Sequence, residues 1–188
     1  MEELLSYRLS DLALFSEATL HRQFELYNNW LGPLRYSGFV YAALFIVTWR
    51  AQSLPALRVL AGTTALLWTV CLYGFMQQNY EPINWIVRYF IPVLGLQAAF
   101  LVWTVFKVSV APLSHATLIL WTLASMQSLV ELAAGWPVTA LSAYALTPDS
   151  LAIYSLALMF LLRQSAWLYA PVLLWLSFSS LSYFALGS

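Results

Sequence analysis

Long runs of mainly apolar residues are the feature that most constrains how this chain folds. A helix needs about 20 apolar residues to cross the ~30 Å hydrocarbon core of a bilayer. Such runs cover residues 36–49, 58–77, 83–106, 108–130 and 165–186; the first has 14 residues and the others have 20 to 24. Because 62% of the residues are hydrophobic and only 9% are charged, a soluble domain of this length could not bury so much apolar surface. The sequence therefore predicts an integral membrane protein.

A further run, between Asp149 and Arg163, is shorter and contains only 13 uncharged residues. At 1.5 Å per helical residue it falls short of the bilayer core, so we expect a span that is short, tilted or placed where the bilayer thins. The runs are continuous in hydrophobicity, which is typical of helices and not of a spanning barrel. We predict an all-α polytopic transmembrane helical bundle of about six spans, with five spans and a re-entrant segment as the alternative.

The N-terminal segment, residues 1–33, is more polar than the rest of the chain. In the stretch SEATLHRQFELYNNWL (16–31), apolar residues recur at helical spacing on one face and polar residues cover another. Ser16 is a typical N-cap, and Glu17 suits the first helical turn. We predict that 1–33 is an amphipathic interfacial segment at the extracytoplasmic surface, and that 34–188 form the six-span bundle as a single domain.

Charge placement orients the predicted bundle. With six spans both termini lie on one side, and the loops after spans one, three and five lie on the other. Those loops contain Arg50, Arg58, Lys107 and Arg163 and no acidic residue. By the positive-inside rule these loops are cytoplasmic, so both termini are predicted to be extracytoplasmic.

Polar residues predicted to share the extracytoplasmic side form the candidate ligand site. They come from the N-terminal helix, from the start of the third span in PINWIVRYFIP (82–92) and from the outer end of the fourth span. For the residues of the third span the alternative is an interfacial anchor, because arginine and aromatic side chains suit that depth. The candidate ligand-binding residues are His21, Arg22, Glu25, Asn28, Asn84, Arg88 and Glu131.

Several kinds of chemistry lack support in the sequence. Equal numbers of basic and acidic residues leave no basic field, so no nucleic-acid partner is predicted. No nucleophile elbow, phosphate loop or zincin motif occurs, so we predict no catalytic residue and no cofactor. His21 and Glu25 are one helical turn apart and could form half of a metal site, but a surface pair is the commoner explanation of that spacing, and no metal ligand is predicted.

Three stretches, SYRLSDLALFSEATLHRQFELYN (6–28), YEPINWIVRYF (80–90) and GLQAAFLVW (95–103), carry a resemblance to a known family. They resemble a family of uncharacterised bacterial integral membrane proteins with a domain of unknown function, often named as major-facilitator permeases. The resemblance implies six spans in a bacterial inner membrane. A helix-opening Asp-Pro-Thr of that family corresponds here to TPDS (147–150), and this departure argues against a special role for Asp149.

Two functional hypotheses follow from these observations. The favoured one is a non-enzymatic integral membrane protein with an extracytoplasmic polar vestibule, acting as an accessory or assembly subunit or as a ligand-binding protein. The alternative is a small transporter of a small molecule. A major-facilitator transporter has about twelve spans, so a chain of about six spans would act as a dimer. The predicted partners are the lipid bilayer and either a larger membrane protein complex or a second copy of this chain.

Overall fold

The computed structural model describes residues 15–104, 106, 115–143, 145–162 and 166–187, where the regular structure is helical and no strand occurs. The elements are α2 (Glu17–Leu31), η2 (Gly32–Tyr36), α3 (Ser37–Ala51), α4 (Leu54–Cys71), η3 (Leu72–Tyr80), α5 (Val87–Thr104), α6 (His115–Ala133), η4 (Val138–Ala140), α7 (Pro148–Leu161), η5 (Ala166–Tyr169) and α8 (Ala170–Gly187). The predicted all-α class is confirmed. Residues 1–14 of the predicted N-terminal segment, and the loop residues Lys107 and Arg163, lie outside the described residues.

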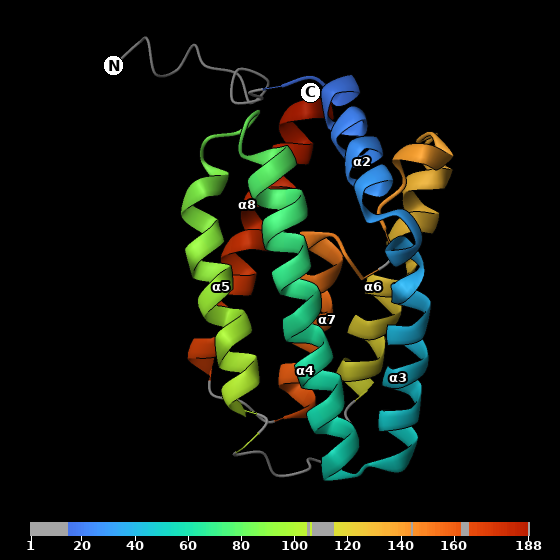
Figure 1. Cartoon of the computed structure of the whole chain (residues 1–188), viewed down its shortest axis with the longest axis vertical. Coiled ribbons are helices and arrows are strands. Elements are labelled where there is room, and N and C mark those ends of the chain that lie inside the picture. The colour runs from blue at the N-terminus through green and yellow to red at the C-terminus, as the bar shows by residue number, and fades with distance from the viewer. Residues whose placement is uncertain (1–14, 105, 107–114, 144, 163–165, 188) are drawn as a thin grey trace.

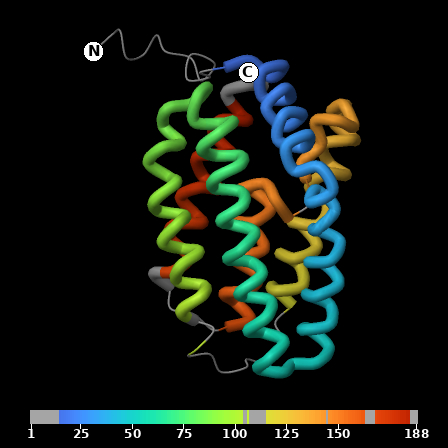
Figure 2. Tube along the Cα trace, viewed as in Figure 1, coloured from blue at the N-terminus to red at the C-terminus, as the bar shows by residue number. Residues whose placement is uncertain are grey.

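The helices form an elongated bundle in which the chain runs alternately down and up (Figure 1). α2 begins and α8 ends at one end, called here the upper end, whereas α3 is joined to α4 at the lower end. The tube in Figure 2 shows the same path, with α4 and α5 side by side and α7 in the middle of the bundle. α7 packs against α4, α6 and α8, and nearly all of its residues are buried. The core is therefore centred on α7.

Three helical stretches are long and apolar enough to cross a membrane. They are Glu17–Ala51, Leu54–Tyr80 and His115–Ala133, and shorter apolar helices cover Val87–Trp103, Pro148–Leu161 and Ala170–Phe184. Large apolar side chains are exposed on the outer faces of several of these helices, including Val40, Leu66, Leu96 and Leu174. Exposed apolar side chains in such numbers suit a lipid environment. The structure thus indicates a membrane protein.

Local sequence signals explain where α2 and α4 begin and where α2 ends. The Ser16 side chain accepts a hydrogen bond from the Thr19 N–H at 3.2 Å, and Ser53 caps α4 in the same way. Gly32 closes α2 with a φ of 51°, a conformation that favours glycine. α2 and α3 are therefore separate helices joined by η2, although α3 continues downward from α2 (Figure 1).

Residues 134–143 and 145–147, called here the α6–α7 connection, depart most from a simple bundle. The connection leaves the upper end of α6 and returns to the middle of the bundle, where α7 begins (Figure 1). Gly135 and Ala145 have positive φ values of 88° and 59°, which turn the chain. The Tyr27 hydroxyl of α2 donates a hydrogen bond to the Leu146 carbonyl at 2.9 Å. α7 has only 14 residues, in agreement with the short apolar run in the sequence.

Candidate functional site

The polar face of α2 binds the backbone of the α6–α7 connection. Asn28 Nδ2 donates hydrogen bonds to the carbonyl oxygens of Thr139 and Leu141, both at 2.9 Å. The Thr139 hydroxyl donates a hydrogen bond to Glu25 Oε1 at 2.8 Å. Non-helical backbone inside a membrane protein needs partners within the protein, because lipid offers none. Asn28 and Glu25 therefore hold the connection against α2.

Glu131 binds the same connection from α6. Its side chain is buried, and Oε2 accepts a hydrogen bond from the Ser142 N–H at 2.7 Å. Oε1 accepts hydrogen bonds from the Ser142 hydroxyl and from Gln127 Nε2, the latter at 3.1 Å. The Ser128 hydroxyl donates to the Ser142 carbonyl at 2.9 Å. A buried carboxylate is tolerated where several donors replace its lost hydration, and these donors fix Ser142 against α6.

His21 and Arg22 occupy different surroundings on α2. The His21 ring lies 4.3 Å from the Trp136 ring, measured between centroids, and its Nε2 lies 3.7 Å from the Glu17 carboxylate. Arg22 is exposed and forms a 3.0 Å ion pair with Glu25. His21 thus contacts the α6–α7 connection, whereas Arg22 belongs to a surface ion pair. Among the described residues, no three His, Cys, Asp or Glu side chains gather as ligands for a metal ion.

The two candidates of the predicted third span lie at the turn between η3 and α5. Asn84 is buried before the helix, and its Oδ1 accepts a hydrogen bond from the Ile86 N–H at 3.3 Å. Arg88 is exposed on the first turn of α5, and its Nε and Nη2 donate to Glu81 Oε1 at 3.2 and 3.1 Å. Since α5 begins at Val87, only Arg88 of the two lies within the helix. Both residues find these partners in the turn, away from the α6–α7 connection.

Asp149, to which the sequence assigned no special role, lies in the first turn of α7. Its carboxylate accepts hydrogen bonds from Trp175 Nε1 at 2.8 Å and from the Tyr183 hydroxyl at 3.4 Å, both on α8. Glu131 and Tyr183 also lie within electrostatic range of Asp149. The N-terminal turn of a helix favours a negative group. A second carboxylate therefore belongs to the polar interior shared by α6, α7 and α8.

A groove of about 670 Å³ lies beside this interior and is called here the α3–α6 groove. Its polar lining includes Asn28, Ser128 and Thr139, and its apolar lining includes Phe39 and Leu129. The polar groups come from α2, α6 and the α6–α7 connection, while exposed apolar residues come from α3 and α6. This combination suits an amphipathic ligand, because polar groups orient a ligand and apolar walls bind its body.

Arg35, in η2, supplies the positive charge of the α3–α6 groove. Its Nη2 donates a hydrogen bond to the Tyr36 hydroxyl at 2.7 Å, and its guanidinium lies 4.8 Å from the centre of the Tyr36 ring. Arg22 and Arg88 each form an ion pair with a glutamate, but within the described part of the chain Arg35 forms none. The charge of Arg35 is therefore not neutralised by a neighbouring carboxylate in the described structure.

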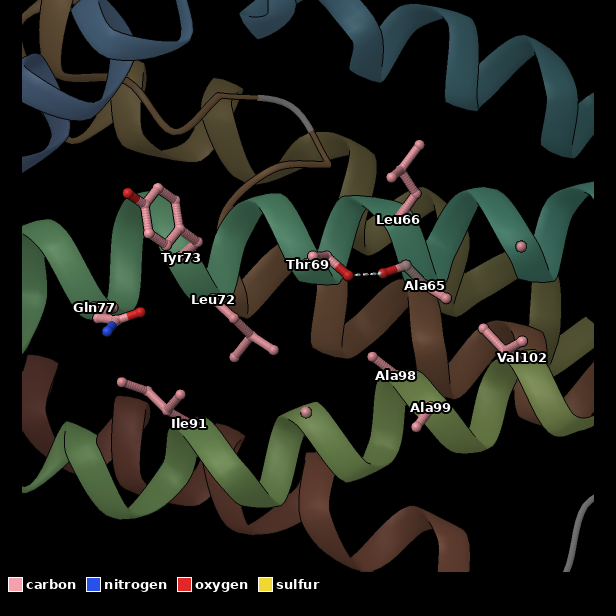
Figure 3. Close-up of a pocket in the computed structure, with 12 residues that line it drawn as sticks. Ala65, Leu66, Thr69, Leu72, Tyr73, Gln77, Ile91, Ala98, Ala99 and Val102 are labelled. Carbon is pink, nitrogen blue, oxygen red and sulfur yellow. Dashed lines mark hydrogen bonds between the residues drawn. The ribbon is translucent and has the colours of Figure 1, made fainter.

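A second groove, of about 620 Å³, lies between α4 and α5 (Figure 3). Gly62, Gly95 and Ala99 contribute little side-chain volume to its lining. The Thr69 hydroxyl donates a hydrogen bond to the Ala65 carbonyl at 3.1 Å, so its proton is already engaged. This α4–α5 groove has apolar surface for lipid chains and few polar groups that could orient a ligand.

The structure brings some of the predicted site residues together and separates others. Four of them contact the α6–α7 connection: His21, Glu25, Asn28 and Glu131. Arg22 stays on the outer surface of α2, and Asn84 and Arg88 shape the η3–α5 turn. Of the predicted residues, Asn28 also lines the α3–α6 groove.

Sequence reasoning missed Arg35 and Asp149 for different reasons. Arg35 directly precedes the first apolar run and was not among the candidate ligand-binding residues, although an arginine next to a tyrosine at a span boundary is a typical headgroup contact. Asp149 follows Thr147 and Pro148, which is a helix-start pattern, and the apolar run after it is too short for a full span. Together these two signals indicate a helix that begins inside the bundle.

We compared the chain with protein-family models, with curated proteins and with solved structures, and none of the three comparisons gave a match. The function is therefore argued from the geometry of the groove and of the α6–α7 connection.

Proposed function

We propose that this chain is a non-enzymatic, multi-pass integral membrane protein that binds a small ligand in the α3–α6 groove. The observation that carries the proposal is the combination of a cavity of about 670 Å³ with polar and apolar lining. Small-molecule sites have volumes of roughly 300–1,000 Å³ and combine an apolar lining with a few orienting polar groups. The ligand-bound protein would act by itself or as an accessory subunit of a larger membrane complex.

Six membrane crossings with α2 outside the hydrocarbon core agree with the lengths of the η2–α3 pair, α5 and α8, whereas the 14 residues of α7 span only about 21 Å. η2 and α3 contain 5 and 15 residues, which together span about 32 Å, close to the ~30 Å core. α5 and α8 contain 18 residues each, or about 27 Å. Trp30 and Tyr36 are exposed where α2 meets α3, and Trp85 and Tyr89 are exposed around the start of α5, as in an interfacial aromatic belt. In this arrangement α2 is the predicted interfacial helix.

The charges of the α3–α4 loop region support an orientation with both termini extracytoplasmic. Arg50 and Arg58 lie near the lower ends of α3 and α4. Glu17, Glu25 and Glu81 belong to elements near the upper end. Cytoplasmic loops carry an excess of basic residues, and this rule favours a cytoplasmic lower end.

A transporter is the second candidate, and the start of α7 inside the bundle is the observation that favours it. Counted from Leu161 at the lower end of α7, Asp149 lies about 18 Å higher, well inside a ~30 Å core. Interrupted helices and ionisable residues at depth occur at the substrate or ion sites of transporters. For a chain of this size, that candidate includes a second copy as partner.

Filling the α3–α6 groove tests the proposed function. Leu129 lines the groove and is 60% exposed, so Leu129→Trp occupies the groove without overpacking the core. In native mass spectrometry of protein extracted gently from its own membrane, we expect a discrete bound mass on the wild type and its loss from Leu129→Trp. Ala99→Trp fills the α4–α5 groove instead and should keep the bound mass.

Two results would contradict the proposal. One is a bound mass that survives in Leu129→Trp, because the ligand would then lie elsewhere. The other is a wild-type protein that carries no small ligand but a stoichiometric protein partner, which would favour a purely structural accessory subunit.

A further inference from the structure

We infer that the ligand of the α3–α6 groove is an anionic phospholipid from the surrounding bilayer, bound through its phosphate by Arg35. The inference rests on the proposed ligand-binding function and specifies the chemical class of the ligand.

Arg35 has the charge and the donor geometry that suit a phosphate. An arginine guanidinium presents several N–H donors in a planar fork that matches a phosphate. The Tyr36 ring and hydroxyl orient the guanidinium of Arg35 and engage one N–H, so the other donors remain for a ligand. Because the Tyr36 hydroxyl accepts that bond, its own proton is also available for a phosphate oxygen.

The carboxylates that contact the groove lining do not cancel this charge. Glu25 bonds to Thr139 of the lining and forms an ion pair with Arg22. Glu131 is buried and accepts the donors of Ser142 and Gln127. Since both carboxylates already have donors, the electrostatic complement of the groove is an anion placed near Arg35.

The depth of Arg35 in the proposed membrane also suits a lipid headgroup. It lies at the end of η2, and the η2–α3 pair is about as long as the bilayer core is thick, so Arg35 lies close to headgroup level. Phe39 follows one helical turn below on α3 and is 66% exposed, and Leu129 of α6 is 60% exposed. Phe39 thus provides apolar surface for an acyl chain below a phosphate held by Arg35, and Leu129 adds apolar lining to the same groove.

The serines of the groove lining favour a headgroup that carries hydroxyl groups. The Ser125 hydroxyl donates to the Trp121 carbonyl at 2.8 Å, and the Ser128 hydroxyl donates to the Ser142 carbonyl at 2.9 Å. With its proton engaged, the Ser128 oxygen remains an acceptor, whereas the Ser125 oxygen already pairs with the Tyr154 hydroxyl at 2.9 Å and keeps one further acceptor position. Phosphatidylglycerol combines one anionic phosphate with two headgroup hydroxyls and is therefore the suitable probe.

Lipid competition measured by native mass spectrometry tests the inference. Purified full-length protein is exchanged into mixed micelles of phosphatidylglycerol and zwitterionic phosphatidylcholine, and the retained lipid is identified by mass. We expect about tenfold preference of the wild type for phosphatidylglycerol, typical of a charge-assisted contact, and equal retention of the two lipids by Arg35→Gln. Arg50→Gln removes the same charge from the opposite end of α3 and should keep the preference.

The outcomes separate this inference from the proposed function. If Leu129→Trp abolishes retention of both lipids while Arg35→Gln changes neither, the groove binds a ligand but the assignment of an anion to Arg35 is wrong. If Leu129→Trp changes nothing, both the inference and the groove proposal are wrong. If inorganic phosphate alone stabilises the wild type against heat, but not Arg35→Gln, and added lipid gives no further stabilisation, the ligand is a soluble anion and the lipid assignment is overturned.

Discussion

Asn28 donates hydrogen bonds to backbone carbonyl groups of the α6–α7 connection. η4 is short, so the carbonyl groups within it and directly after it have few helical partners, and Asn28 donates to those of Thr139 and Leu141. The sequence analysis placed Asn28 among the ligand-binding residues. In the structure both bonds of its amide nitrogen go to backbone carbonyls, so its main contribution is to the stability of the α6–α7 connection.

Removing this amide should destabilise the fold measurably. We expect Asn28→Ala to lower the free energy of unfolding by about 2 kcal/mol, because two part-buried carbonyl oxygens lose their donor. The midpoint of thermal unfolding in a mild detergent measures the effect. Asn29→Ala is the matched control, since Asn29 is the adjacent amide on the exposed face of α2 and its removal should leave the midpoint nearly unchanged. Equal effects of the two substitutions would show that the contacts of Asn28 contribute nothing specific.

Two carboxylates of the interior, Glu131 and Asp149, are held by donors from different elements. Glu131 is bound by Ser142 of the connection and Gln127 of its own helix, whereas Asp149 is bound by Trp175 and Tyr183 of α8. Glu131 therefore joins α6 to the connection that follows it, 11 residues further on, and Asp149 joins α7 to residues of α8 that are 26 and 34 residues further on. This arrangement explains why acidic residues persist within an otherwise apolar bundle.

At the scale of elements, the α6–α7 connection is held by hydrogen bonds from two helices, α2 and α6. α2 binds it through Asn28 and Tyr27, and α6 binds it through Glu131 and Ser128. Such a segment gains its order from side chains, because it has little regular secondary structure of its own. Substitution of these hydrogen-bonding residues should therefore lower the local stability of the connection more than that of α4.

Hydrogen exchange can test this dependence. We expect Glu131→Leu to speed amide exchange over residues 138–143 and 145–147 by at least tenfold, since Ser142 loses both of its donations to the carboxylate. Exchange in α4 should stay unchanged and serves as the internal reference. Glu131→Gln keeps an acceptor of the same size and should have a smaller effect. Faster exchange throughout the chain would mean instead that Glu131 stabilises the whole fold rather than the connection.

At the scale of the whole molecule, the two ends of the bundle differ in character. The upper end carries α2, the α6–α7 connection and the α3–α6 groove, whereas the described part of the lower end consists of helix ends and the short turn between α3 and α4. The proposed ligand site therefore lies toward one side of the proposed membrane. The orientation of the bundle determines which compartment that side faces.

Cysteine labelling in intact cells determines this orientation. Gln52 in the α3–α4 turn has a φ of 43°, so the neighbouring Ala51, which is exposed, is the better site for substitution. We expect Ala51→Cys to resist an impermeant thiol reagent and Gln78→Cys, exposed on η3, to react readily. The native Cys71 is fully buried and should give no background. The reverse pattern would invert the proposed topology.

The helical class and most helix positions were predictable from the sequence because they depend on local information. Apolar runs between charges indicate membrane helices, Ser16 caps α2 where the pattern places it, and the short run after Asp149 corresponds to the 14-residue α7. The start of α5 was placed four residues too early, at Ile83, because the turn that Asn84 stabilises has the same apolar composition as the helix. Composition alone does not distinguish the two.

The candidate site depended on contacts that leave no local trace in a single sequence. Asn28 and its carbonyl partners are separated by 111 and 113 residues, and no periodicity relates positions so far apart. For the same reason only the folded chain shows that Arg22 and Arg88 have glutamate partners. It also shows that Arg35 lines a groove and forms no ion pair with a glutamate among the described residues. Hydrophobicity and capping act between residues close in sequence, so they determined the helices; the path of the α6–α7 connection and the residues around the groove depend on long-range packing, which tertiary structure decided.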